Sequence, residues 1–179
     1  MMQTYVALLR GINLGSHNKV SMPDLRTLFA ELGAEEITTY VQSGNVVFNM
    51  SRRAEAALRK AIEQRINRDL GLDVAVLVRT KAQLARVHAR MPFAAHSDEP
   101  TKLHVTFLAE TPDRSRARAL RSPSGADELE VVGREVYLYL PHGYGRTKLG
   151  NTYFEQELGV TATTRNWRTV SKLVELTSA

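Results

Sequence analysis

The order in which strand and helix patterns follow one another over the first 80 residues restricts the fold of this chain most. Residues 4–9 form a short apolar run typical of a buried strand, and residues 36–49 read as two more strands around a glycine turn. Apolar residues recur at helical spacing over residues 21–32 and 51–70, and residues 73–78 form a last strand. The resulting β-α-β-β-α-β order is typical of a ferredoxin-like α+β sandwich, with two helices on one face of an antiparallel sheet.

This topology makes a geometric prediction about two polar loops. The first helix returns the chain, so the loop after the first strand and the turn of the hairpin belong at the same end of the sheet. We therefore expect Arg10 and Asn13 to lie close to the Gln42–Asn45 turn.

The second half of the chain repeats the pattern in altered form, and we expect one lobe at residues 1–80 and another at 81–179. No fourth long strand is obvious in the second lobe, and the remaining candidate is residues 160–164. The other elements expected there are helices at 81–91, 113–121, 152–158 and 166–176, a strand at 102–109 and a hairpin at 128–140 turning at Gly133.

Composition bounds the chemistry of the chain. It has 24 Lys and Arg against 19 Asp and Glu, a formal charge of +5, which favours anionic partners weakly. The absence of cysteine excludes disulfides, thiolate metal sites and thiol catalysis, and fits a reducing compartment. The first residues lack a positive leader, and the apolar run ending at Leu9 is far too short for a membrane span. We therefore expect a cytoplasmic protein that does not associate with membranes.

Two polar segments lie in the loops that the topology brings together. The segment from Arg10 to Gly15 has glycines that allow a sharp turn, while Arg10 and Asn13 offer hydrogen-bond donors to an anion. It does not match the G-x-G-x-x-G pattern of dinucleotide binding. Gln42, Ser43 and Asn45 could bind the same ligand. The alternative for both segments is ordinary turn chemistry with no ligand.

Two further polar segments lie in the second lobe. Residues 145–152 have the G-x-x-x-x-G spacing of a phosphate-binding loop, but Asn151 stands where that loop needs lysine, which disfavours nucleoside triphosphate binding. A simpler anion site at the start of the next helix would use backbone N–H groups with Arg146 and Lys148, and the alternative is a solvated basic loop. Near the C-terminus, Arg165 and Asn166 are candidate ligand-binding residues, whereas Trp167 fits the apolar stripe of a helix.

Known catalytic patterns are missing from the sequence. The five histidines show no H-E-x-x-H pattern or close ligand spacing, and no G-x-S-x-G elbow is present. We expect no metal site and no cofactor, and the sequence names no nucleophile or general base. Whether the protein is an enzyme is left open.

Three separated motifs carry a resemblance to a known family. They are Arg10-Gly11-Ile12-Asn13, the run from Thr39 to Phe48 (TYVQSGNVVF), and the run from Thr164 to Val170 (TRNWRTV). In this order they resemble the bacterial family called domain of unknown function 1697, over nearly the whole chain. The resemblance implies a two-lobed ferredoxin-like architecture. The family has no established reaction, cofactor or partner, so the resemblance implies no catalytic residue.

The leading functional hypothesis is a small protein that binds an anionic or phosphorylated ligand in a polar cleft. Its candidate residues are Arg10, Asn13, Gln42, Ser43, Asn45, Lys148, Arg165 and Asn166. One alternative is an interaction protein without a small ligand, and the sequence does not determine the oligomeric state. The other is a nucleic-acid binding module with a basic and aromatic surface, which would consist of Tyr144, Arg146, Lys148, Arg165, Trp167 and Arg168.

Overall fold

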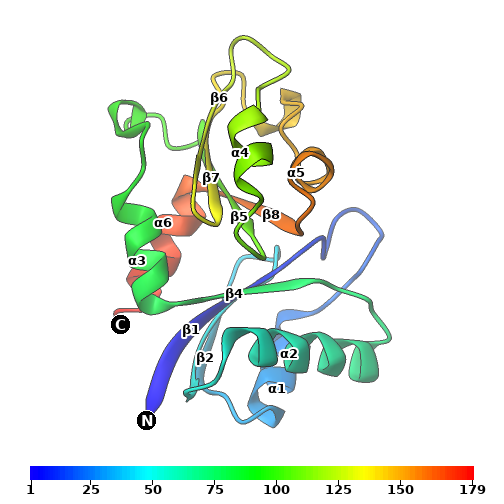
Figure 1. Cartoon of the computed structure of the whole chain (residues 1–179). Helices are drawn as coiled ribbons and strands as arrows, with labels where there is room; N and C mark the ends of the chain where they lie inside the picture. The colour runs from blue at the N-terminus through cyan, green and yellow to red at the C-terminus, as the bar shows by residue number, and fades with distance from the viewer. The chain divides into compact units, whose positions relative to one another are not determined.

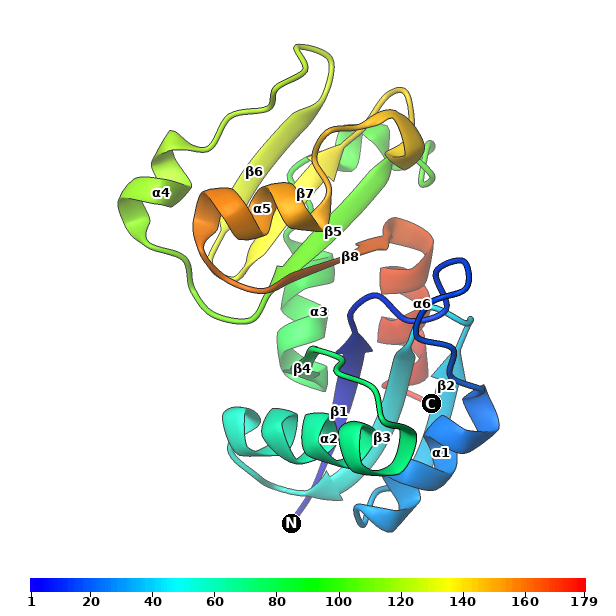
Figure 2. The same ribbon diagram turned by 90° about the vertical axis from the view of Figure 1, so that its right-hand side faces the viewer.

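The N-terminal part of the chain forms a four-stranded antiparallel sheet with two helices on one face, in a computed structural model that describes all 179 residues (Figures 1 and 2). The strand order is β2-β3-β1-β4, so the first and third strands are central. This is the expected ferredoxin-like arrangement. The elements are β1 (Met2–Leu9), α1 (Met22–Glu31), β2 (Glu35–Tyr40), β3 (Asn45–Ser51), α2 (Glu55–Leu70) and β4 (Val76–Thr80).

An aromatic cluster forms the centre of the core between this sheet and its helices. Phe48 of β3 stacks on Tyr5 of β1, with ring centroids 5.7 Å apart, and meets the edge of Phe29 of α1 at 5.0 Å. All three rings are buried. Leu58, Ile62 and Ile66 of α2 pack into the same core, at the helical spacing seen in the sequence.

The serine cap predicted from the sequence is present at the start of α1 but not at the start of α2. Ser21 caps α1 as expected, since its Oγ accepts a hydrogen bond from the Asp24 amide at 3.1 Å. Ser51 does not cap α2, because it is the last residue of β3 and its backbone pairs with Met2 of β1. The helix begins at Glu55, after Ala54, without a side-chain cap. Continued strand pairing therefore overrides the serine cap signal.

The second unit repeats the topology of the first. Its sheet has the strand order β6-β7-β5-β8, with α4 and α5 on one face (Figures 1 and 2). The short strand at 162–166 supplies the fourth strand and pairs antiparallel with β5. The chain thus contains two ferredoxin-like halves. The elements are β5 (Leu103–Leu108), α4 (Arg114–Ala119), β6 (Glu128–Val132), β7 (Glu135–Tyr139), α5 (Asn151–Leu158) and β8 (Ala162–Asn166), with short 3-10 turns η1 (Ala94–His96) and η2 (Tyr144–Arg146).

A helix follows the last strand of each half directly. Thr80 and Gln83 form a reciprocal cap at the start of α3 (Lys81–Ala89), and Asn166 caps α6 (Trp167–Leu176) by accepting a hydrogen bond from the Thr169 amide. The fourth residue of each of these strands is a buried arginine, Arg79 in β4 and Arg165 in β8. The similarity of the halves therefore extends to particular buried side chains.

The chain divides into two compact units. One contains residues 1–85 together with 172–179, and the other contains residues 86–171. The C-terminal residues thus belong with the N-terminal sheet, whereas the sequence pattern grouped all of 81–179. None of the helices combines the length and the apolar character needed to cross a membrane.

The aromatic cluster makes a stability prediction. We expect Phe48→Ala to lower the free energy of unfolding by about 3–5 kcal/mol, because it removes a fully buried ring and leaves a cavity. Urea unfolding followed by circular dichroism measures the loss. Leu14→Ala is the control, because Leu14 is exposed in a loop and its truncation should change stability by less than about 0.5 kcal/mol. Equal effects of the two substitutions would contradict this view of the core.

Candidate functional site

The loop after β1 and the β2–β3 turn meet at one end of the N-terminal sheet, which confirms the geometric prediction. The Leu9 amide donates a hydrogen bond to the Gly44 carbonyl at 2.8 Å. The Asn13 Nδ2 donates to the Gln42 carbonyl at 2.7 Å. Two segments about thirty residues apart along the chain are therefore joined by direct hydrogen bonds.

Asn13 acts as a clasp for the loop after β1. Besides the bond to Gln42, its Nδ2 donates to the Val20 carbonyl at 3.0 Å and its Oδ1 accepts from the Val20 amide at 2.9 Å. The Asn13 backbone is left-handed, with φ of 54°, a conformation that asparagine tolerates better than most residues. Asn18 adds a bond from its Nδ2 to the Gly11 carbonyl. The Asn13 side chain thus positions the loop.

Asn45, the residue after the turn at 41–44, stabilises that turn by hydrogen bonds. This asparagine is buried, and its Nδ2 donates to the Tyr40 carbonyl at 2.9 Å and to the Ser43 Oγ at 3.0 Å. Val41, the first residue of the turn, has a φ of 51° and is half exposed. A β-branched residue in that region costs about 1–3 kcal/mol and persists only where its surroundings enforce it. The turn therefore contains a strained residue at Val41.

Gly44 is where the β2–β3 turn packs against the end of β1 and the loop that follows it. A Cβ at this position would lie 2.7 Å from Leu9 Cβ and 2.9 Å from Ile12 Cδ1, and the φ of Gly44 is +85°. A side chain would thus meet both a steric and a backbone obstacle. Only glycine allows the turn to pack this closely against the end of β1.

We expect Gly44→Ala to destabilise the protein by more than about 2 kcal/mol, because the added methyl collides with Leu9 and the backbone conformation is unfavourable. Gly33→Ala is the matched control. Gly33 has a φ of +90° but nothing within 4 Å of a Cβ, so only the backbone cost of about 1–2 kcal/mol applies there. Chemical unfolding of both variants isolates the steric part. A loss in Gly44→Ala no larger than in Gly33→Ala would contradict the close packing.

This end of the sheet carries both cationic and polar side chains. Arg10 is half-buried and its amide donates to the Ala75 carbonyl, while Lys19 is exposed on the same loop. Gln42 and Ser43 are exposed on the adjoining turn. Arginine and amide or hydroxyl groups of this kind can pair with a phosphate or carboxylate and orient it.

The remaining predicted site residues lie on the second unit. Lys148 is exposed in the loop before α5, and Gly150 at the start of that helix makes no side-chain capping bond. The loop is tied down by Thr147, whose Oγ1 donates to the Asp127 carboxylate at 2.6 Å and accepts from the Leu149 amide at 3.0 Å. The Thr147 hydroxyl therefore ties this loop to Asp127 and to the loop's own backbone.

Arg165 and Asn166 make internal hydrogen bonds. Arg165 is buried, and its Nη1 donates to the Thr163 Oγ1 at 2.8 Å and to the Thr164 carbonyl at 3.0 Å. Burial lowers the pKa of the Arg165 guanidinium to about 10, so it remains charged at neutral pH. The Asn166 Oδ1 caps α6. Both side chains have structural roles within the second unit.

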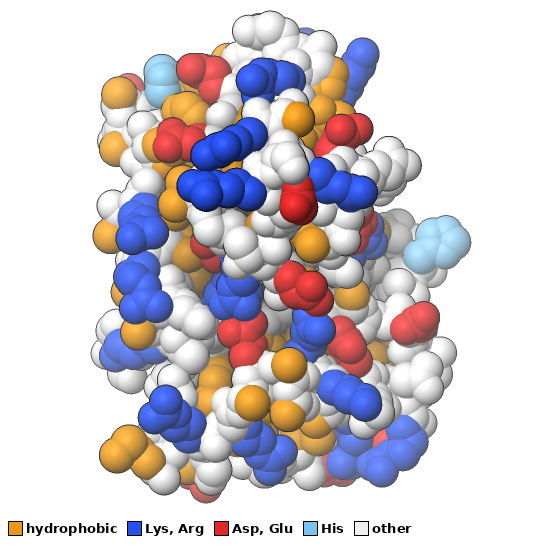
Figure 3. Space-filling view, in the orientation of Figure 1, with side chains coloured by type: hydrophobic (Ala, Val, Ile, Leu, Met, Phe, Trp, Pro, Cys, Tyr) orange, Lys and Arg blue, Asp and Glu red, His pale blue; other side chains and the backbone are white.

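The aromatic residues of the nucleic-acid alternative are stacked on histidines. Trp167 lies parallel to the His88 ring with centroids 4.6 Å apart, and Tyr144 stacks on His104 at 5.1 Å. One face of each ring is therefore covered. On the surface shown in Figure 3, basic side chains are interspersed with acidic ones and form no continuous stripe.

His104 is a buried histidine that the sequence reasoning did not single out. Only 6% of it is exposed, and its Nδ1 has no hydrogen-bond partner. Burial lowers the pKa of His104 to about 4, so the ring is neutral at physiological pH. The sequence did not indicate that His104 is buried and neutral, because a single histidine within an apolar strand forms no recognisable motif.

His104 predicts an acid-dependent loss of stability. Its pKa is lower in the folded than in the unfolded chain, so the unfolded state binds the extra proton below about pH 6.5. The free energy of unfolding should fall as the pH drops from about 6.5 towards 4, by about 3 kcal/mol from this group alone.

Urea unfolding at pH 7 and pH 4.5 measures this effect. His104→Gln should remove a large part of the pH dependence, and His142→Gln, at an exposed histidine, should leave it unchanged. Identical pH dependence in the wild type and in His104→Gln would contradict the assignment.

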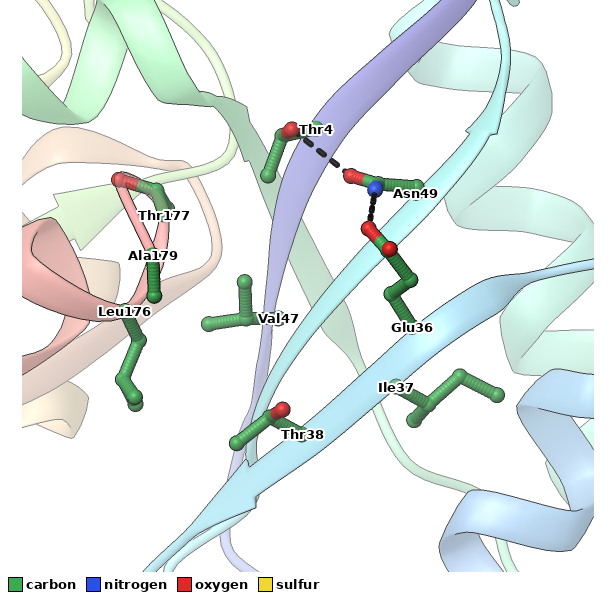
Figure 4. Close-up of a pocket in the computed structure, with 9 residues that line it drawn as sticks. All are labelled: Thr4, Glu36, Ile37, Thr38, Val47, Asn49, Leu176, Thr177 and Ala179. Atoms are coloured by element: carbon green, nitrogen blue, oxygen red, sulfur yellow. Dashed lines mark hydrogen bonds between the residues drawn. The ribbon is translucent and has the colours of Figure 1, made fainter.

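The sequence also missed a cavity lined by Thr4, Glu36 and Asn49, on the other face of the N-terminal sheet (Figure 4). These residues come from three strands, and no local motif connects them. No group of three or more His, Cys, Asp or Glu side chains is arranged to hold a metal ion.

The fold defines a protein built from two ferredoxin-like halves. The chain belongs to the family of proteins of unknown function DUF1697, whose model matches residues 2–137. It is similar in structure to the conserved bacterial protein SP0830 from Streptococcus pneumoniae, with a TM-score of 0.79, 23% sequence identity and 99% of each chain covered. No curated protein matches the sequence.

Proposed function

We propose that the protein binds a small anionic, phosphorylated ligand through the joined loops at the end of the N-terminal sheet. The observation that supports this proposal most is the clasp between Asn13 and Gln42, which keeps Arg10 on the same end of the sheet as the exposed Gln42–Ser43 turn. A loop that is already ordered before the ligand arrives loses little conformational entropy when the ligand binds.

The roles of the residues in this proposal differ. Arg10 pairs with the anion, with Lys19 adding positive charge, while Gln42 and Ser43 orient it by hydrogen bonds. Asn13 and Asn45 position the loops, because their amides are engaged with backbone groups. The site thus works through charge and positioning and includes no nucleophile.

Binding of phosphorylated probes tests the proposal. Pyrophosphate, adenosine monophosphate and glucose 6-phosphate are titrated by calorimetry and in thermal-shift assays. We expect saturable binding of at least one probe, and Arg10→Ala should weaken it at least tenfold, because a charge-assisted hydrogen bond contributes about 1.5–3 kcal/mol.

The matched control is Arg52→Ala, which removes one positive charge beyond the far end of β3 and should leave the affinity unchanged. Gln42→Ala tests the turn without altering charge or a buried group. Absence of binding for all three probes, or equal affinities in wild type, Arg10→Ala and Gln42→Ala, would overturn the proposal.

Nucleic-acid binding is the second candidate, and the exposed cations Arg146, Lys148 and Arg168 favour it. It requires binding of a single-stranded or double-stranded oligonucleotide that weakens steeply as salt rises. Fluorescence anisotropy at 50 and 200 mM salt distinguishes it from the small-ligand proposal, since Arg10→Ala should have little effect on such binding.

A further inference from the structure

A cavity of about 340 Å³ lies on the face of the N-terminal sheet that α1 and α2 do not cover (Figure 4). Thr4 of β1 and Val47 and Asn49 of β3 alternate along their strands with core residues, and so point to this other face. The opposite side is lined by Leu176, Thr177 and Ala179, which belong to the same compact unit.

A chain of hydrogen bonds orders the polar wall of the cavity. The Thr4 Oγ1 donates to the Asn49 Oδ1 at 2.7 Å, and the Asn49 Nδ2 donates to the Glu36 Oε2 (Figure 4). These two bonds orient the Asn49 amide and hold one carboxylate oxygen of Glu36. The second oxygen of Glu36 takes no part in this chain.

The backbone of β2 is deformed where it carries Glu36. The pairing of β2 with β3 shifts register between Glu35 and Thr38, and the φ of Glu36 is 49°. Such a bulge inserts an extra residue into an edge strand and redirects a side chain, and bulges are over-represented at sheet edges and next to active sites. A regular strand would not bring the Glu36 carboxylate to the Asn49 amide in this way.

The lining combines one negatively charged side chain with apolar surface. Glu36 is the only ionisable side chain that lines the cavity, and no Lys, Arg or His does so. Val47 and Leu176 provide aliphatic walls, and in Figure 4 they lie across the cavity from each other. A carboxylate oriented by an amide and set beside aliphatic side chains is suited to a positively charged donor on a short hydrocarbon chain.

We propose that this cavity binds an alkylammonium group, either of a free amine or of a lysine side chain on a peptide. The ammonium donates to the Glu36 carboxylate, and its methylene chain packs between Val47 and Leu176. Thr38, at the rim, supplies a hydroxyl acceptor.

This site is separate from the proposed anion site. Thr4 and Arg10 are six residues apart on and just beyond β1, which corresponds to about 20 Å of extended chain. The required ligand has the opposite charge. Failure of one proposal therefore leaves the other standing.

The test is a titration of the ¹⁵N-labelled full chain, followed by NMR, with n-butylammonium chloride, n-butanol and Nα-acetyl-lysine N-methylamide. We expect n-butylammonium to shift the backbone amide signals of Glu36, Val47 and Asn49 saturably. The neutral n-butanol has the same hydrocarbon chain and should bind at least tenfold more weakly. The lysine derivative distinguishes the two sources, since its binding assigns a peptide side chain and its exclusion assigns a free amine.

Three variants complete the design. Glu36→Gln keeps the acceptor for the Asn49 amide but removes the charge, and should weaken n-butylammonium binding at least tenfold. Glu35→Gln, at the exposed neighbour on the same strand, should leave it unchanged. Leu176→Ala should reduce the preference for n-butylammonium over methylammonium, which tests the apolar wall even if Glu36→Gln fails to fold. Equal binding of n-butanol, or shifts unaffected by both Glu36→Gln and Leu176→Ala, would overturn the proposal.

Discussion

The antiparallel pairing of β1 with β3 is the constraint on which both candidate sites depend. It runs over seven residue pairs, from Met2 opposite Ser51 to Leu8 opposite Asn45. At one end it brings the Arg10 loop onto the Gln42–Ser43 turn. Further along it sets Thr4 directly opposite Asn49, so that their side chains share one face. A slip of one residue would move every side chain of a strand to the other face and would abolish both arrangements.

The two faces of this sheet are used differently. The face towards α1 and α2 is filled by the aromatic cluster around Phe48, which holds the register because any shift would expose a large ring. The opposite face carries the polar chain from Thr4 to Glu36. The same opposite face also includes the buried apolar residues Val6, Leu8 and Val47. The core therefore supplies the rigidity, while this polar chain and the loop ends are where specific chemistry is available.

The second unit repeats the same strand order but uses its polar residues in another way. Arg165, Asn166 and Thr147 are engaged in hydrogen bonds that hold strands, a helix start and a loop. Polar residues in buried or semi-buried positions must find partners, since an unpaired buried group costs about 1–3 kcal/mol. A motif of polar residues in a sequence is thus as readily explained by this requirement as by a ligand.

The sequence by itself determined the element order, the helical stripes and the helix cap at Ser21, because these depend on neighbours within a few residues. It also determined that the Arg10 loop and the Gln42 turn share one end of the sheet, because that follows from topology alone. The tertiary structure alone decided that the Asn13 and Asn45 side chains hold the two loops by hydrogen bonds to backbone carbonyls. It alone decided that Ser51 extends a strand and that His104 is buried and neutral. It also decided the cavity at Glu36, since a bulge and a chain of hydrogen bonds across three strands arise from contacts between residues more than ten positions apart, which no local pattern records.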